Sequence, residues 1–560
     1  MTVIAKGVNL SDAIKRSIDV KPDGVEAVDL QNGILKNSVE HSFNIPAEII
    51  ANSQKLLLKF YPSRFSKVIE GLDTIFRMPY GCFEQSTSVT YPNVMALLYM
   101  KSTGQVTPEI EAKARKFITT GYQRLLTFEV SGGGFDWFGE PPAKEKLTAY
   151  GIMQLIDISK VHEIDQAVIQ RASKWLMSRQ KEDGSWDGFG PKESQIKNKI
   201  STDNTAYIAW ALAEADIKGP LLDKALAFLR QNLSEADSSY TTALAANALL
   251  ANNLNDPFGM QLVSKLTSKF QLQGNSMYVP SSGFGAMHSR GSCLDIETTA
   301  LSALAIMKVN PYADTARKGL AWLFEQKDIR GTCRSTQATV LAIKALTTGT
   351  DEPGSNNAKS SRIDVTVNNR SAGSIEITSD MRDLLYTKNL TSYLQQGENK
   401  IHITQNQAIE LPYSLVGTYW VPGTPTDTSS EKDLKLKVNY DKDHLTVDDV
   451  LTCNVQVNKR GDNPSGMVII NLGVPPGFMV DTSIFEHLVK SGILARYEVN
   501  ANRYILYIRS IIPDKPLNFI YEMKALYPIR ATIPSSKVYE YYQPENSDRT
   551  KPIEIMVEKK

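Results

Sequence analysis

The segment Gly81-Cys82-Phe83-Glu84-Gln85 places a thiol and a side-chain amide three residues apart. Positions i and i+3 share one face of a helix, so the Cys82 sulfur and the Gln85 carboxamide can meet if a helix starts here. Attack of the sulfur on the carboxamide would expel ammonia and leave an internal thioester, which is a stored acylating group. The alternative is a half-buried cysteine at the start of a core helix, so the rest of the sequence has to decide.

The start of a helix would assist this reaction. Its unpaired N–H groups and its dipole stabilise a thiolate and lower the pKa of a cysteine. They also stabilise the oxyanion that develops at the Gln85 carbonyl. Glu84 either assists proton movement or is a solvated carboxylate of the first turn, and the second arrangement is the more common one.

The composition is that of an ordinary multidomain globular protein. The 560 residues are 42% hydrophobic and 22% charged, with a formal net charge of +1. Three or four domains are expected at this length, and the balanced charge argues against a nucleic-acid or anionic-membrane partner. No apolar run is long enough to span a bilayer, and the N-terminal residues lack the apolar core of a signal peptide. No cysteine or histidine cluster has zinc spacing, so we expect neither a metal nor another cofactor.

The chain changes character twice along its length. Strand-like alternation up to about residue 60 gives way to helical patterns from about 70 to 350. There a Thr/Ala-rich motif recurs at 147–151, 204–208, 240–244, 297–301 and 336–340. Between its copies lie amphipathic helices with an aromatic–leucine pair, namely Trp175-Leu176, Phe228-Leu229 and Trp322-Leu323. Small-residue helices inside and bulky ones outside predict an α/α toroid.

Strand patterns resume after the turn-rich segment 347–357, and a second linker covers 422–430. One helix is expected in the last region, at Ser483–Lys490. We predict a multidomain α+β fold: residues 1–62 and 360–422 form the two halves of one β sandwich, 63–350 form the inserted toroid, and 432–560 form a C-terminal β sandwich.

The segment Pro79–Gln85 resembles the thioester motif of the alpha-2-macroglobulins and complement thioester proteins, usually written Gly-Cys-Gly-Glu-Gln. The resemblance extends over the whole chain: a split CUB-type β domain, an inserted thioester-bearing toroid, and a C-terminal macroglobulin-like, receptor-binding-type domain. Pro475-Pro476-Gly477-Phe478 fits that last domain, and Lys537–Glu545 is similar to its last strand. Phe83 replaces the glycine usual in animal members, a form associated with bacterial relatives.

The resemblance implies a function. The chain would be the C-terminal portion of a bacterial-type alpha-2-macroglobulin, a complement-like protease inhibitor of innate defence. It would be secreted or periplasmic, with its upstream macroglobulin domains, its bait region and any membrane anchor in a missing N-terminal part. It would act as a single-turnover covalent trap and not as an enzyme, with Gln85 acylating amines of a captured protease or target surface.

In this family aromatic side chains of the C-terminal domain cover the thioester. Tyr539, Tyr541 and Tyr542 match the region that supplies one of them. Strand alternation would put Tyr539 and Tyr541 on one face and Tyr542 on the other, so we expect one of the three to be the cover. Tyr80 and Phe83 are further candidates for shielding.

The positions of the histidines indicate which kind of group, amine or hydroxyl, would accept the acyl group of Gln85. Hydroxyl-reactive complement members carry a histidine in a loop that corresponds to residues 183–203, and none is present here, which favours direct reaction with amines. His288 precedes an inner helix and could approach Cys82, although a histidine without a role in catalysis is more common in such a loop.

Cys293 and Cys333 each open an expected inner helix, so they either come within disulfide reach or remain two buried thiols. A disulfide would support an oxidising compartment.

Two other functions fit part of the sequence. Gln180–Trp186 matches the glutamine–tryptophan repeat of triterpene cyclases, but the acidic cluster and zinc ligands of toroidal isoprenoid enzymes are absent from the sequence. The second alternative is a binding or adhesion module of the same architecture in which no thioester forms.

Overall fold

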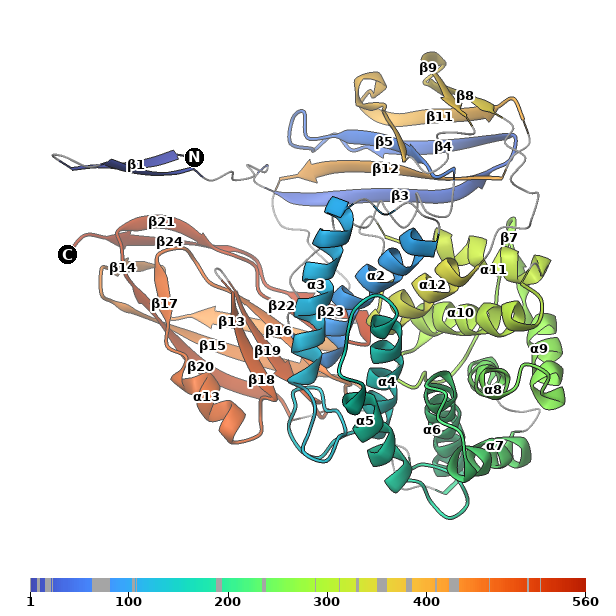
Figure 1. Ribbon diagram of the computed structural model, residues 1–560. Coiled ribbons are helices and arrows are strands. Elements are labelled where there is room, and N and C mark those ends of the chain that lie inside the picture. The colour runs from blue at the N-terminus through green and yellow to red at the C-terminus, as the bar shows by residue number, and fades with distance from the viewer. Residues whose placement is uncertain are drawn as a thin grey trace.

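The computed structural model describes residues 2–7, 11–15, 22, 24–62, 81–102, 106, 108–187, 194–233, 238–287, 289–311, 313–328, 332–349, 360–378, 385–407, 410–422, 433–462, 464–500, 503–513 and 515–560. The chain forms a β sandwich, a ring of helices and a second β sandwich (Figure 1). The predicted multidomain α+β fold is confirmed.

The first sandwich is built from strands on both sides of the helical region. Its sheets have the orders β10–β5–β12–β3 and β4–β11–β8–β9, and all their strand pairs are antiparallel. The strands are β3 (Val25–Leu35), β4 (Ser38–Ile45), β5 (Lys55–Phe60), β8 (Ser361–Val367), β9 (Arg370–Ile377), β10 (Tyr386–Asn389), β11 (Gly397–Gln405) and β12 (Leu411–Val421). The helical insertion leaves the sandwich after β5 of the first sheet and returns at β8 of the second sheet, so both sheets anchor it. A separate hairpin, β1 (Thr2–Lys6) and β2 (Ser11–Lys15), projects away from it (Figure 1).

The helices form two concentric layers. The inner ring consists of α2 (Phe83–Ser102), α4 (Glu145–Ser159), α6 (Ser194–Glu214), α8 (Ser239–Asn252), α10 (Gly291–Val309) and α12 (Thr336–Thr348). Each contacts the next, and α12 closes the ring onto α2. The outer layer consists of α3 (Pro108–Leu126), α5 (Gln166–Ser178), α7 (Pro220–Asn232), α9 (Pro257–Lys269) and α11 (Asp314–Glu325). A short hairpin of β6 (Gln271–Gln273) and β7 (Ser276–Tyr278) precedes α10.

Composition explains which helix lies in which layer. The Thr/Ala/Leu-rich α8 is buried on all sides, because small side chains let neighbouring helices approach closely. The amphipathic α5 and α7 bury one stripe each and expose the opposite face. The predicted α/α toroid is confirmed.

The glutamine–tryptophan motif ties the outer helices together. The Gln180 side-chain amide donates to the carbonyl oxygens of Gly184 and Leu221, both at 2.9 Å. The Trp186 indole donates to the Leu176 carbonyl at 2.8 Å. The motif therefore joins the end of α5 to the start of α7, a structural role that needs no isoprenoid chemistry.

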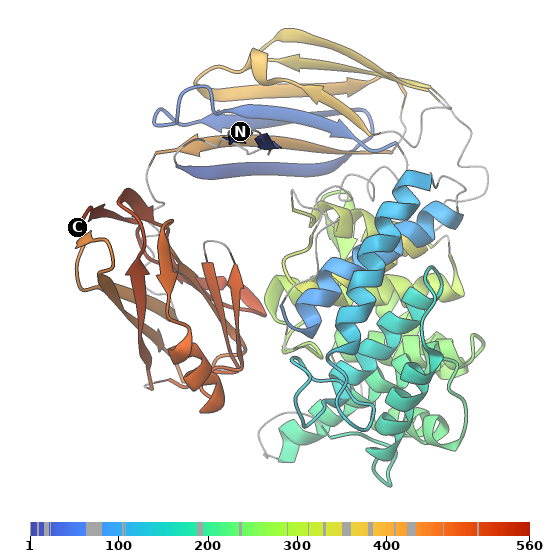
Figure 2. The same cartoon turned by 60° about the vertical axis from the view of Figure 1, so that its left-hand side comes forward.

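The C-terminal sandwich contains three sheets, with the orders β13–β15–β20–β17, β14–β24–β21 and β18–β19–β16–β22–β23. The predicted helix at Ser483–Lys490 is present as α13. Figure 2 shows this sandwich beside the ring, with the first sandwich above both. The strands are β13 (Leu434–Tyr440), β14 (His444–Thr446), β15 (Val450–Lys459), β16 (Val468–Gly473), β17 (Phe478–Val480), β18 (Arg496–Asn500), β19 (Arg503–Ile508), β20 (Leu517–Ala525), β21 (Ile529–Ile533), β22 (Lys537–Glu540), β23 (Gln543–Arg549) and β24 (Ile553–Glu558).

One strand assignment was wrong. Lys537–Glu545 is not the last strand: it is β22, a turn at Tyr541-Tyr542, and the start of β23, with β24 still to follow. The turn matters because it brings these two tyrosines to the helical ring.

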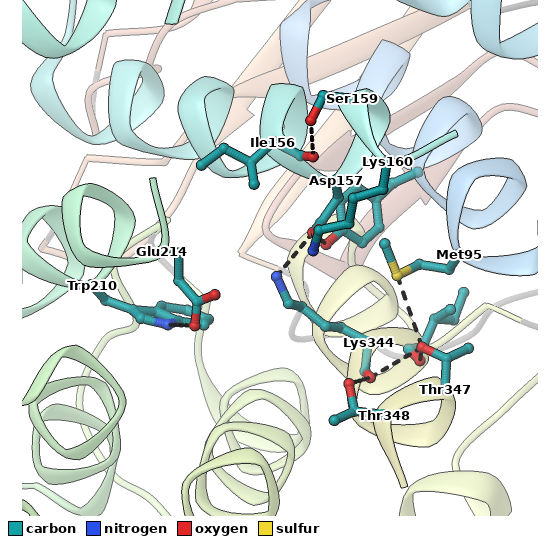
Figure 3. Close-up of polar contacts among 12 residues, drawn as sticks. Met95, Ile156, Asp157, Ser159, Lys160, Trp210, Glu214, Lys344, Thr347 and Thr348 are labelled. Atoms are coloured by element: carbon teal, nitrogen blue, oxygen red, sulfur yellow. Dashed lines mark hydrogen bonds and ion pairs between the residues drawn. The ribbon is translucent and has the colours of Figure 1, made fainter. Parts of the chain in front are cut away.

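A buried charge cluster joins the C-terminal ends of the inner helices (Figure 3). The Lys344 ammonium on α12 lies 2.9 Å from Asp157 Oδ2 on α4, and Lys160 lies 2.7 Å from Asp157 Oδ1. Tyr91 on α2 donates a hydrogen bond to the same carboxylate. Burial raises the pKa of Asp157, but the two ammonium groups outweigh burial and lower it to about 2.

Replacing Lys344 by methionine is expected to lower the free energy of unfolding by about 3–5 kcal/mol, because it leaves the Asp157 carboxylate buried with weaker compensation. Urea unfolding followed by circular dichroism at neutral pH measures the loss. The matched control is Lys318→Met, which removes a partly exposed pair with Asp314 and should cost less than about 1 kcal/mol. Equal losses in the two variants would contradict this account of the cluster.

Candidate functional site

The structure brings Cys82 and Gln85 together at the start of the inner ring. α2 begins at Phe83, and the Cys82 carbonyl accepts the Ser86 N–H at 2.9 Å, so Cys82 occupies the N-cap position. The backbone N–H of Cys82 donates to Gln85 Oε1 at 3.1 Å. The Gln85 carboxamide therefore folds back over the helix start, on the same turn as the thiol.

Gly81 makes this arrangement possible. Its φ of 81° lies in the left-handed region, which glycine enters without steric cost. A Cβ atom at this position would lie 1.8 Å from Gln85 Oε1. Only glycine leaves room for the carboxamide.

A second donor to Gln85 comes from the C-terminal sandwich. The Tyr507 hydroxyl on β19 donates to Gln85 Oε1 at 2.9 Å. Its neighbour Glu498 on β18 accepts the Gly81 N–H at 3.1 Å and lies 3.3 Å from the Arg124 guanidinium. Arg124, on α3, also donates to the Gly81 carbonyl at 2.6 Å. These contacts fasten the C-terminal sandwich directly onto the helix start.

Tyrosines of the β22–β23 hairpin cover the same place. The Tyr541 hydroxyl lies 2.8 Å from Thr336 Oγ1 at the start of α12, and the Tyr542 hydroxyl donates to Glu84 Oε2 at 2.7 Å. Tyr539 packs in the adjoining cluster with Tyr507. The expected strand alternation fails because β22 ends at Glu540 and the following turn directs both Tyr541 and Tyr542 toward the ring. Two tyrosines of the hairpin, and not one, thus contact the ring beside Cys82.

Phe83 points into the ring. Its ring centroid lies 5.9 Å from that of Phe128, 5.5 Å from that of Phe135 and 5.9 Å from that of Tyr150. The space exists because α4 carries Gly151, where an added Cβ would lie 3.3 Å from Phe83 Cζ. Phe83 therefore anchors the helix start in the core and closes the site from the inside.

Comparison with known protein families identifies two of the domains. Residues 57–348 match the family model of the A-macroglobulin TED domain, and residues 463–551 match that of the A-macroglobulin receptor binding domain. The chain belongs to the alpha-macroglobulin family. The helical ring is its TED domain, and the C-terminal sandwich contains its receptor-binding domain.

Solved structures of bacterial alpha-2-macroglobulins share the fold. Salmonella alpha-2-macroglobulin reacted with methylamine matches with a TM-score of 0.73 at 17% identity, covering 99% of this chain and 35% of that one. Native Escherichia coli alpha-2-macroglobulin from domain MG7 to the C-terminus matches with a TM-score of 0.71 at 15% identity, covering 98% and 84%. This chain thus spans about a third of the length of the Salmonella protein.

Burial dominates the electrostatics where the TED and receptor-binding domains meet. Cys82 is 0% exposed. Burial and the nearby Glu84 carboxylate raise the pKa of the Cys82 thiol to about 12, and the backbone N–H groups of the helix start offset this only in part. The expectation that the helix start would lower this pKa is wrong for the docked state.

Glu84 is not a solvated carboxylate, because only 2% of it is exposed. Burial raises its pKa to about 7, and the hydrogen bond from Tyr542 and the nearby Trp137 indole offset part of that rise. Glu297, Tyr150 and Tyr207 face the same interior, and burial raises the pKa of Glu297 to about 8. The carboxyl of Glu84 therefore holds a proton at mildly acidic pH while the domains are docked.

This shift makes docking depend on pH. If the receptor-binding domain separated from the ring and water reached Glu84, the pKa of Glu84 would fall toward its ordinary value. Because the raised pKa belongs to the docked state, docking is strongest below the ordinary pKa of Glu84 and weakens as the pH rises through about 7. The change is at most about 3 kcal/mol.

Glu84→Gln is expected to remove most of this pH dependence. Hydrogen exchange of residues 81–86 between pH 5 and 8, corrected for the intrinsic pH dependence of exchange, measures it. Glu486→Gln, at an exposed site on α13, is the control. If the corrected exchange rate changed with pH as steeply in Glu84→Gln as in the unmodified chain, the assignment of the pH dependence to Glu84 would be refuted.

The remaining candidates from the sequence are Cys293, Cys333, Tyr80 and His288. No disulfide joins Cys293 and Cys333, and both side chains are buried. Cys293 lies in the first turn of α10, and Cys333 precedes α12 by three residues. Tyr80 and His288 lie outside the described residues.

Within the described residues no group of three His, Cys, Asp or Glu side chains could hold a metal ion. Over that same part of the chain, no helix has the length and apolar character needed to cross a membrane.

Proposed function

We propose that Cys82 and Gln85 form a thioester and that this chain is the thioester-bearing C-terminal part of a bacterial-type alpha-2-macroglobulin. The observation that carries the proposal is the Gln85 carboxamide held over the Cys82 N–H at 3.1 Å, inside a site that the receptor-binding domain closes. The Salmonella relative was crystallised after reaction with methylamine, which supports an amine-reactive group in this fold.

Burial would preserve the bond until it is needed. Tyr507, Tyr541 and Tyr542 keep water from the carbonyl. A thiolate that is poorly stabilised is also a poor leaving group, and the pKa of about 12 describes such a thiolate in the docked state. Undocking removes both protections together, because solvent then reaches the carbonyl and stabilises the departing sulfur.

The reaction that follows is a single acyl transfer. An amine nitrogen attacks Gln85 Cδ, the Cδ–Sγ bond breaks, an amide forms, and the proton lost by the amine ends on the Cys82 sulfur. Nothing regenerates the thioester, so the chain would act once, as a covalent trap and not as a turnover enzyme.

The acceptors would be lysine amines of a captured protease or another protein surface. The sequence between residues 183 and 203 contains no histidine to form the acyl-imidazole that hydroxyl transfer requires. Protease selection and the trigger for undocking would come from upstream domains, in a secreted or periplasmic protein.

The test compares acceptors of two kinds. A low concentration of chaotrope separates the receptor-binding domain of the purified chain from the TED domain. Either a lysine-containing peptide or glycerol is present at equal molarity. We expect the peptide, and not glycerol, to become attached to Gln85, as identified by mass spectrometry of the digest. Equal attachment of glycerol would overturn the amine preference, and attachment of neither would overturn the thioester itself.

A further inference from the structure

The Gln85 carbonyl oxygen accepts hydrogen bonds from two directions. The Cys82 backbone N–H reaches it from within the helix start at 3.1 Å, and the Tyr507 hydroxyl reaches it from the receptor-binding domain at 2.9 Å. Two donors on one carbonyl oxygen are the arrangement that stabilises an oxyanion during acyl transfer. The second donor is present only while the two domains are docked.

The Tyr507 hydroxyl is placed to donate to Gln85. It lies closer to Gln85 Oε1, at 2.9 Å, than to Glu498 Oε2, at 3.3 Å. The Gly81 N–H and the Arg124 guanidinium already engage the other oxygen of Glu498. Burial and the Glu498 charge raise the pKa of Tyr507, so the hydroxyl keeps its proton. The tyrosine ring is fully buried against Phe138, with centroids 5.6 Å apart.

We propose that Tyr507 and the Cys82 N–H form the oxyanion site in which the thioester is made, so that docking of the receptor-binding domain catalyses formation of the bond in addition to covering it. This inference rests on the proposed function, since it supposes that Cys82 and Gln85 become joined.

The chemical step balances without a co-reactant. The Cys82 sulfur attacks Gln85 Cδ, and the carbonyl oxygen becomes an oxyanion held by the two donors. The Cδ–Nε2 bond then breaks while the Sγ–Cδ bond remains, the thiol proton ends on the departing nitrogen, and ammonia leaves. Tyr507 donates a hydrogen bond throughout and loses no proton.

Shielding alone does not require this contact. A cover needs bulk, and Tyr541 and Tyr542 supply bulk while their hydroxyls engage Thr336 and Glu84. Among these three tyrosines, the Tyr507 hydroxyl is the one with a hydrogen bond to Gln85. Loss of one oxyanion donor slows acyl transfer by about 10²–10³-fold.

The experiment separates a bond that never formed from one that formed and was lost. The chain is synthesised in a cell-free translation reaction, and samples are quenched at intervals in urea with methylamine. After digestion, residue 85 is found in one of three states. Unmodified glutamine means that no thioester formed, the methylamide means that it was intact, and glutamate means that it formed and was hydrolysed.

Tyr507→Phe keeps the buried ring and removes only the hydroxyl. We expect the sum of methylamide and glutamate to accumulate about 100-fold more slowly than in the unmodified chain, with residue 85 remaining glutamine. The control is Arg509→Gln, which loses an ion pair with Glu140, 3.8 Å away across the same domain interface, but keeps the Tyr507 hydroxyl on Gln85. The Arg509→Gln variant should form the bond at close to the normal rate.

Three results would overturn the inference. Formation in Tyr507→Phe at the normal rate would leave Tyr507 a cover only. Equally slow formation in Arg509→Gln would mean that docking in general, and not the Tyr507 hydroxyl, is required. If the unmodified chain keeps glutamine at residue 85 throughout, the proposed function itself fails and the inference fails with it.

Discussion

Replacing Cys82 by serine is expected to abolish methylamine incorporation completely. A hydroxyl in place of the thiol is a far weaker nucleophile toward the Gln85 carboxamide, and an alkoxide is a far worse leaving group than a thiolate. The variant should retain the mass of the unmodified amide, with no loss of ammonia, and should gain nothing on incubation with methylamine. Intact-mass spectrometry of both proteins measures this directly.

Cys333→Ser is the matched control for the cysteine replacement. Cys333 is also buried in the TED domain, and burial likewise raises the pKa of its thiol to about 12. The Cys333→Ser variant should incorporate methylamine to the same extent as the unmodified chain. Incorporation by Cys82→Ser, or its loss in Cys333→Ser alone, would show that the reactive sulfur had been misassigned.

Replacing Gly81 by alanine is expected to reduce thioester formation by more than about 100-fold. The added Cβ would lie 1.8 Å from Gln85 Oε1, so the carboxamide has to leave its position over the Cys82 N–H. A displacement of about 1 Å at reacting groups is enough to cost about 10²-fold in rate. The fraction of purified chains that incorporate methylamine measures the loss.

Gly492→Ala controls for backbone strain in that experiment. Gly492 also has a positive φ, 75°, but nothing lies within 4 Å of the Cβ that alanine would add. Alanine at position 492 would have the same unfavourable left-handed backbone, which costs about 1–2 kcal/mol of conformational free energy, but its Cβ would obstruct no neighbouring group. Normal incorporation in Gly81→Ala, or an equal loss in Gly492→Ala, would refute the steric role of Gly81.

Much of the fold could be predicted because its signals are local. The Thr/Ala-rich and aromatic-rich helices differ in composition, and that difference alone separates α8 in the inner layer from α11 in the outer one. The sequence also predicts the helix at Ser483–Lys490, which the structure has as α13 with these bounds. The thiol–amide pair at Cys82 and Gln85 was also predictable, since its members are three residues apart.

The other half of the site comes from a domain more than 400 residues further along the chain. Nothing in the alternation of β19 distinguishes Tyr507 from the nearby Tyr504, and only docking shows that its hydroxyl meets Gln85. The burial of Glu84 could not be predicted for the same reason, because the side chains that bury it include Tyr542 of that domain. Properties that depend on docking, including the raised pKa values of Cys82 and Glu84, could not be predicted from the local sequence.

The most direct test of the thioester is the intact mass of freshly purified protein before and after methylamine, with thiols titrated in parallel. The account predicts a mass short by one ammonia, stoichiometric addition of methylamine at Gln85, and the simultaneous appearance of one thiol at Cys82. A full, unmodified mass with Cys82 already titratable and no methylamine added would contradict it.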